Sequence, residues 1–449
     1  MLITDGTLIT MEAENRILSD HALYIADGVI REIGQTADLI ARYPHEERLS
    51  AGGMYVMPGN ICAHTHFYGA YARGMAIPGD PPRNFPEILS RLWWNLDKAL
   101  DRDAVRASAL VCLVDAIRHG TTTLFDHHAS PNAIEGSLDW IAQAVEQAGL
   151  SAVLCYEVTD RDGLDKAEAG IAENVRFIRA WQDHPRIRGT FGLHASLSLS
   201  GQTLRAARQA HPEGDAGGFH IHVAEHEADE EDSLARYGKR VVQRLHEHGI
   251  LGRRSITAHC VHTDAAERAL LKETGTWITH QPRSNMNNAV GAMPLDEMMA
   301  EGQKLCLGND GFSNVMYEDW KAAYFLHKVV SRDPRRANGV WIAEMALANN
   351  AALAEQFFPG QSIGKLIPGA RADIIFVDYH PFTPLTAGNL PWHIIFGFEA
   401  SMITTTIAGG RVLMRDRQLL TLDEKAVAEE ALALAPAVWE RYNRIAQTT

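Results

Sequence analysis

Histidines at the ends of short apolar runs are the residues of this chain best suited to metal chemistry. His64 and His66 lie one residue apart in the run NICAHTH, so on a strand both imidazoles would point to the same side. Such a pair is weak evidence alone, since His220 and His222 form a second one in HIHVAE. The first pair gains weight because it follows PGNICA, where a long alternation of strand and helix patterns begins.

A carboxylate follows the second pair. Glu225 comes three residues after His222. A carboxylate on the turn after a strand-end ligand would lie beside a metal ion rather than on it, which is where a general base for water is needed. The alternative is that Glu225 belongs to the solvated acidic run EHEADEED.

Two later runs also end in polar residues, His259 in SITAHCVH and Asp310 in LCLGND. Either one alone is equally consistent with a structural polar residue. Three histidines and one aspartate gathered at one place would supply nitrogen ligands and a hard oxygen. This set suits a single Zn²⁺ or Fe²⁺ with one coordination position left open.

Other catalytic motifs are missing from the sequence. It has no HExxH, no HxE followed by PCxxC, no GxSxG elbow, no P-loop and no GxGxxG after a strand. No lysine lies in the third or fourth strand-like run, which disfavours a carbamylated lysine bridging two metals. We therefore expect one divalent metal, with Zn²⁺ favoured over Fe²⁺.

The segments that must position these residues alternate along most of the chain. Residues 1–57 show short β-rich runs with Gly and Asn turns, and residues 361–449 return to such runs before a helix at 423–446. Between them, residues 58–360 carry strand-like runs separated by amphipathic helices. The runs are NICAHTH, TTTLFDHH, SAVLCYEV, GTFGLHAS, GFHIHVAE, SITAHCV, TWITHQP and KLCLGND. The fold class predicted is α/β: a TIM-like (β/α)8 barrel with a small β-sandwich domain formed by both chain ends.

Composition limits the partners. The chain has 449 residues, a net charge of −14 and no cluster of Lys or Arg, which argues against nucleic acid or an anionic membrane as partner. The start of the chain has no signal-peptide pattern and no apolar run approaches ~18 residues. The five cysteines are scattered and odd in number, as is typical of reduced thiols in a cytoplasmic protein. We expect a small-molecule substrate and a homo-oligomer, with a dimer favoured.

The ordered motifs resemble the amidohydrolase superfamily, in its deaminase and chlorohydrolase branch. The motifs that carry the resemblance are VMPGNICAHTHFYGAYARG, GLHASLSLS, HIHVAEH, TAHCVH, HQPRSNMNNAVG, LGNDG and GKLIPGARADIIFVD, spanning residues 54 to 378. Closer in, WWNLDKAL, DHHASP, YGK and RSNMNN resemble the SsnA-type aminohydrolases. Resemblance to 8-oxoguanine, guanine and isocytosine deaminases is looser.

The resemblance implies roles for individual residues. The implied metal ligands are His64, His66, His222 and Asp310. Glu225 would take a proton from water and pass it to a ring nitrogen. His259 would stabilise charge on the attacked centre, and Asp310 would also accept the remaining water proton and help deliver it to the leaving amine.

The substrate contacts are a second group of predictions. Arg73, Trp93, His127, His194 and His280 are the candidates for binding a planar heterocycle. Four of them have a structural alternative: a loop clamp for Arg73, a place in the core for Trp93, a structural role for His127 if His128 points into the mouth instead, and a brace of the seventh loop for His280. The His194 position carries an arginine in guanine deaminases, so strict guanine specificity is not expected.

The function predicted is hydrolytic deamination of an amino-substituted nitrogen heterocycle, with a metal-activated water releasing ammonia. The preferred chemotype is the 2-amino-4-oxopyrimidine unit of isocytosine, guanine and 8-oxoguanine. Two alternatives use the same residues. One is a triazine-type chlorohydrolase or alkylaminohydrolase, and the other is a metal-binding barrel without catalysis.

Overall fold

The eight predicted strand runs all form strands in the computed structural model, which describes residues 1–447. The barrel strands are β6 (Asn60–Thr65), β7 (Thr121–His128), β8 (Ser151–Tyr156), β9 (Ile187–Gly189), β10 (Phe191–Ala195), β11 (Phe219–Val223), β12 (Ile256–His259), β13 (Trp277–His280) and β14 (Lys304–Leu307). The fourth run supplies β10, whereas β9 ends at the first residue of that run, Gly189. The last two residues of the predicted C-terminal segment, 448 and 449, lie outside the described residues.

Two parallel sheets, β6-β7-β8-β9 and β10 through β14, make up the barrel wall. A bridge between Val158 and Leu193 joins them at one seam, and a bridge between Thr65 and Asp310 joins them at the other. At the second seam a Cβ on Gly308 would lie 2.7 Å from the carbonyl oxygen of His64. Only glycine therefore lets the end of β14 approach β6 so closely.

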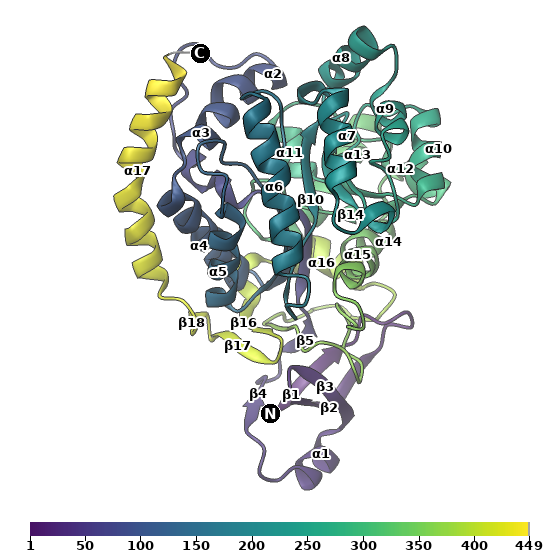
Figure 1. Ribbon diagram of the computed structural model, residues 1–449. Coiled ribbons are helices and arrows are strands. Elements are labelled where there is room, and N and C mark those ends of the chain that lie inside the picture. Colours follow the sequence, from purple (N-terminus) through teal and green to yellow (C-terminus); the bar gives the residue numbers. More distant parts are fainter. Residues whose placement is uncertain (448–449) are drawn as a thin grey trace.

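Helices surround the barrel (Figure 1). They are α4 (Arg102–Arg118), α5 (Ser137–Ala148), α6 (Leu164–Ala180), α7 (Gly201–Ala210), α8 (Glu227–Tyr237), α9 (Val241–Glu247), α10 (Ala265–Thr274), α11 (Pro282–Asn287), α12 (Leu295–Glu301), α13 (Met316–Ser331), α14 (Gly339–Ala343), α15 (Asn350–Phe357) and α16 (Leu390–Gly397). Several begin at an acidic N-cap: Asp101 accepts the Ala104 N–H, and Asp264 forms a capping box with Glu267. Among the described residues, no helix has the length and apolar character needed to span a bilayer.

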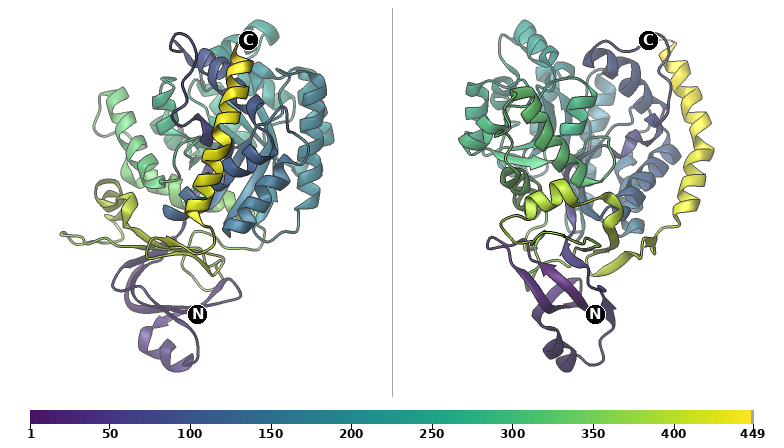
Figure 2. Two further views of the ribbon diagram at one scale, coloured as in Figure 1. Left: turned by 90° about the vertical axis from the view of Figure 1, so that its left-hand side faces the viewer. Right: turned by 180° about the vertical axis from the view of Figure 1, so that it is seen from behind.

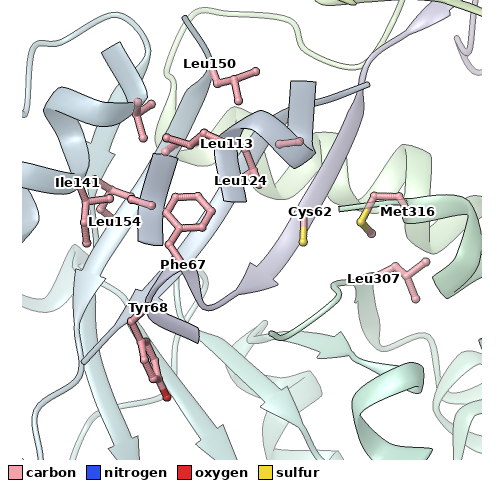
Figure 3. Packing of buried hydrophobic residues seen from close by; sticks show 14 of the residues in the cluster. Cys62, Phe67, Tyr68, Leu113, Leu124, Ile141, Leu150, Leu154, Leu307 and Met316 are labelled. Atoms are coloured by element: carbon pink, nitrogen blue, oxygen red, sulfur yellow. The ribbon is translucent and has the colours of Figure 1, made fainter. Parts of the chain in front are cut away.

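The main hydrophobic core fills the space between barrel and helices. Phe67 points into this core with Leu113 and Leu124, whereas its neighbour Tyr68 points the other way (Figure 3). The Phe67 N–H donates to Asp126, and its carbonyl accepts from the Ser108 hydroxyl. The short 3₁₀ helix Phe67–Ala72 is thereby fixed directly after the His64/His66 pair.

Both chain ends contribute to one mixed sheet of nine strands. It contains β1 (Leu2–Ile9), β2 (Ile17–Ala26), β3 (Val29–Gln35), β4 (Arg48–Ser50), β5 (Tyr55–Pro58), β15 (Ile374–Val377), β16 (Ile403–Ala408), β17 (Arg411–Arg415) and β18 (Gln418–Leu419). The two ends meet where β5 pairs antiparallel with β15. Figure 2 shows this sheet below the barrel, with helix α1 (Thr36–Arg42) at its far edge. The predicted boundaries near residues 57 and 360 stay predictions.

The C-terminal helix α17 (Glu424–Ala446) packs along the barrel flank rather than on the sheet (Figures 1 and 2). Its Trp439 indole donates to the Tyr71 carbonyl, and its Tyr442 hydroxyl donates to the Arg91 carbonyl. Both acceptors lie in the segment that follows the His64/His66 pair. The last helix therefore braces the chain that covers the barrel mouth.

Candidate metal centre and active site

The carboxyl ends of three barrel strands bring the predicted metal ligands together. One ligand atom from each of His64, His66, His222 and Asp310 lies within 4.8 Å of the others. Asp310 Oδ1 is 3.2 Å from His64 Nε2 and 2.9 Å from His66 Nε2. His222 Nε2 is 3.3 Å from His66 Nε2. The ligand atoms thus face a common point.

The hydrogen bonds of the Nδ1 atoms show which ring nitrogens are free to bind a metal. His66 Nδ1 donates to the carbonyl of His127, and His222 Nδ1 donates to the carbonyl of His194. These bonds fix the Nδ1 proton on each ring and turn both Nε2 atoms inward, where a metal ion can bind them. His64 Nε2 and Asp310 Oδ1 are buried with no hydrogen-bond partner. This donor set fits one divalent ion such as Zn²⁺ or Fe²⁺.

His220 supports the proposed metal ligand His64. Its Nε2 lies 2.8 Å from His64 Nδ1, and its side chain is fully buried. The pattern His220-x-His222, which in the sequence looks like a chance repeat, thus places one ring beside a ligand and the other in the ligand set. Burial holds the pKa of His220 well below its usual range, so its neutral ring can fix the orientation of His64.

We expect His220→Ala to lower metal affinity by about 10- to 100-fold, the usual effect of losing a residue that orients a metal ligand. Competition with a chromogenic chelator would measure the dissociation constant. His248→Ala offers a control, because His248 bonds only within its own helix end. Unchanged affinity in His220→Ala would show that His64 is oriented by packing alone.

Glu225 and His259 face the open side of the ligand cluster. The Glu225 Oε2 atom lies 3.4 Å from His259 Nε2, and Asn288 donates to the Glu225 Oε1 atom. Burial and the nearby Asp310 raise the pKa of Glu225 well above its usual range. Asn285 bonds to His259 Nδ1, and burial lowers the pKa of this histidine to about 4. A carboxyl group with raised proton affinity thus lies beside a neutral imidazole.

Strained backbone accompanies these residues. Ala224, His259 and Asp310 have φ values of 46°, 73° and 57°. Residues other than glycine rarely adopt this left-handed backbone region, and such strained residues are often found at functional sites. The turns at Ala224, His259 and Asp310 change the direction of the chain at the barrel mouth.

A cavity of about 280 Å³ opens onto the cluster. Its apolar wall includes Phe85 of α2 (Phe85–Ile88), Leu89 and Trp93 of the π-helical turn Leu89–Trp93, and Trp94 of α3 (Trp94–Ala99). Its opposite wall comes from the loops after β10 and β11. Such a mostly apolar cavity with a few polar groups is typical of a small-molecule site.

The predicted substrate contacts fall into two sets. Trp93 and His194 line the cavity. Arg73 is exposed, and the buried His280 bonds to His327, so neither reaches it. His127 is also fully buried behind the cavity wall. The loop after the 3₁₀ helix carries Arg73 outward. Buried hydrogen-bond partners fix the directions of His280 and His127.

Glu157, directly after β8, lines the cavity and was not among the predicted site residues. Its side chain is only 4% exposed. The signal for it was a carboxylate ending a strand-like run, SAVLCYEV, as Asp310 ends another. Burial opposes its ionisation, but His194 and His127 hold its pKa well below the usual range.

Comparison with known proteins gives the family. The family model described as "Amidohydrolase family" matches residues 55–413. The chain belongs to the amidohydrolase family. It is 32% identical to a 5'-deoxyadenosine deaminase of Methanosarcina mazei over 99% of both chains. It is 30% identical to a 5-methylthioadenosine/S-adenosylhomocysteine deaminase of Syntrophomonas wolfei, over 96% of this chain and 97% of that one.

Solved structures agree with this assignment. The amidohydrolase superposes on an adenosine deaminase from Xanthomonas campestris, with bound zinc, at a TM-score of 0.83 and 25% identity, covering 100% of this chain and 98% of the other. Guanine deaminase of E. coli matches at a TM-score of 0.80 and 19% identity over 92% and 99%, which supports the fold alone. The predicted fold and branch are confirmed, and the protein is a metal-dependent hydrolase acting on C–N bonds.

Proposed function

We propose that this amidohydrolase removes an amino group, as ammonia, from an uncharged nitrogen heterocycle of the nucleobase or nucleoside type. The observation that carries the proposal is the position of Glu225, whose carboxylate lies 3.4 Å from His259 at the open side of the ligand cluster. Full-length relatives named as deaminases support the same chemistry.

The residues divide the work between water and ring. His64, His66, His222 and Asp310 would hold the metal, which lowers the pKa of a bound water toward neutrality. Glu225 is placed to take a proton from that water and give it to a ring nitrogen, which needs a carboxyl group with raised proton affinity. His259 is placed to donate a hydrogen bond to the oxygen on the attacked carbon, in a site shielded from water.

Asp310 has a second partner that suits a role in proton transfer. Its Oδ2 atom accepts a hydrogen bond of 2.5 Å from the Ser284 hydroxyl, while Oδ1 faces the ligand histidines. The carboxylate is therefore held in one orientation. We infer that Asp310 passes the remaining proton to the departing amine and that the metal is Zn²⁺, the ion bound in the similar adenosine deaminase structure.

Two substrate classes compete. The similar proteins are named for 5'-deoxyadenosine, 5-methylthioadenosine and adenosine, which favours a 6-aminopurine nucleoside. The 2-amino-4-oxopyrimidine unit expected from the sequence remains the second candidate. A cavity of about 280 Å³ is close to the lower end, ~300 Å³, of typical ligand sites, so it suits a base with at most a modest substituent.

Ammonia release from the Zn²⁺-loaded enzyme tests the proposal. The panel is 5'-deoxyadenosine, adenosine, 5'-methylthioadenosine, isocytosine, guanine, 8-oxoguanine and an aminotriazine. We expect turnover of one purine or pyrimidine class. A chlorotriazine in the same assay series would detect chloride release, and chloride without ammonia from any amine would replace the proposal by dechlorination.

A further inference from the structure

Glu157 is a buried carboxylate that reaches the cavity from the third barrel strand. Its carboxylate lies within 4.8 Å of a ring nitrogen of both His66 and His222. It is therefore close to the proposed metal centre, where the reacting ring must lie. A group at this depth contacts the heterocycle itself rather than a distant substituent.

His127 holds Glu157 in place from behind. Its Nδ1 atom is 3.1 Å from Glu157 Oε2, and its Nε2 atom faces the carbonyl oxygens of Leu193 and His220 at 3.1 and 3.0 Å. These contacts fix the direction of the ring, and with it the orientation of the Glu157 carboxylate. The second carboxylate oxygen, Oε1, is not used by His127 and remains available to the cavity.

His194 supplies a second acceptor. The Ser198 hydroxyl donates to the Ala195 carbonyl, so its oxygen accepts from His194 Nδ1 at 2.5 Å. That tautomer leaves His194 Nε2 without a proton, 3.8 Å from Glu157 Oε1. Two acceptors thus face each other across the cavity wall with no donor between them.

The remaining wall offers no donor with a charge. None of the described residues that line the cavity is Lys or Arg. The nearest guanidinium, that of Arg161, pairs with Asp97 and Asp162 behind Trp94. A ring N–H of a bound ligand would supply the hydrogen that Glu157 and His194 lack.

We propose that Glu157 is a specificity-determining residue that accepts a hydrogen bond from a ring N–H of the substrate. The site then takes an uncharged heterocycle with such a donor on the edge turned away from Glu225. This rests on the proposed function and deepens it. It favours the second substrate candidate, a lactam base such as the 2-amino-4-oxopyrimidine unit, or a free purine, over a 6-aminopurine nucleoside, whose ring nitrogens carry no hydrogen.

The experiment measures binding apart from turnover. Each protein carries Glu225→Gln and is loaded with Zn²⁺, and equilibrium dialysis gives dissociation constants for two probe pairs, guanine with 1-methylguanine and adenine with 9-methyladenine. The methyl group replaces one ring N–H in each pair. We expect at least one parent base to bind about 10- to 150-fold more tightly than its methyl derivative, the range for a hydrogen bond to a charged group.

Glu157→Gln separates the hydrogen bond from steric exclusion. The amide keeps the shape of the carboxylate but not its charge, so a clash with the methyl group persists while the charged acceptor is lost. We expect the preference for the parent base to fall at least about tenfold. Asp232→Asn is the matched control, because Asp232 lies at the rim of the same cavity and pairs with Arg236; its preference should equal that of the parent protein.

Three results would overturn the assignment. One is a preference for the parent base over its methyl derivative that Glu157→Gln leaves unchanged. Another is no binding of any parent base. The third is a second metal ion per chain that Glu157→Gln removes, since His127 and Glu157 would then be ligands. Discrimination by Glu157 without ammonia release in the panel above would instead refute the proposed function alone.

Discussion

Replacing Glu225 by Gln should lower turnover by about 10²- to 10⁴-fold, the usual contribution of a general acid–base group. The amide cannot take a proton from water, yet it keeps the hydrogen bond that Asn288 donates to Glu225 Oε1. Because Glu225 lies outside the ligand set, metal content should not change. Steady-state rates and metal analysis of the same preparation would measure both quantities.

Glu227→Gln is the control for this substitution. Glu227 lies two residues further on, and its side chain is 71% exposed. We expect its turnover and metal content to match the unmodified protein. If Glu225→Gln kept more than about a tenth of the rate, another group would have to move the proton, and Asp310 would be the first candidate because it faces the same space.

The barrel was predictable because its signal is repeated. Each strand run ends in polar residues and is followed by a helical pattern, so an error in one run does not change the reading of the others. The seams are different. The bridge from Thr65 to Asp310 depends on the close approach that Gly308 permits, and no local pattern in the sequence specifies that contact.

The gathering of the four proposed metal ligands was predictable for a related reason. Strand periodicity places His64 and His66 on one side, and the carboxyl ends of parallel strands meet at one mouth. A side chain's final direction, however, depends on buried partners from other strands. His280 bonds to His327, and Arg73 follows an exposed loop, so neither reaches the cavity.

His127 and Glu157 show the same limit. The sequence placed His127 at a strand end, where a substrate contact is a reasonable expectation. The structure instead turns its ring toward Glu157 and two carbonyl oxygens, so the carboxylate rather than the imidazole reaches the cavity. That exchange depends on the packing of four barrel strands, β7, β8, β10 and β11, and has no signature in the spacing of either residue.

Removing the metal with a chelator should abolish turnover and lower the unfolding temperature. Ion binding stabilises the folded chain by about 4 kcal/mol when free metal is 1,000-fold above its dissociation constant. Stripped enzyme should regain both properties on addition of Zn²⁺, measured by ammonia release and a thermal scan. His66→Ala should regain neither, because its imidazole is 2.9 Å from Asp310 Oδ1 in the ligand set.

The affinity of the stripped enzyme for the metal should increase with pH. In the metal-free protein, burial lowers the proton affinity of His66, but the adjacent Asp310 outweighs it and raises the pKa of His66 to about 9. His64, with a pKa lowered to about 3 by burial, stays neutral. Below pH 9 an incoming ion must therefore displace one proton, so the apparent affinity should rise up to about tenfold per pH unit between pH 6 and 8. An affinity independent of pH over that interval would show that His66 is neutral before the metal binds, and that Asp310 is held by Ser284 rather than by a charged imidazole.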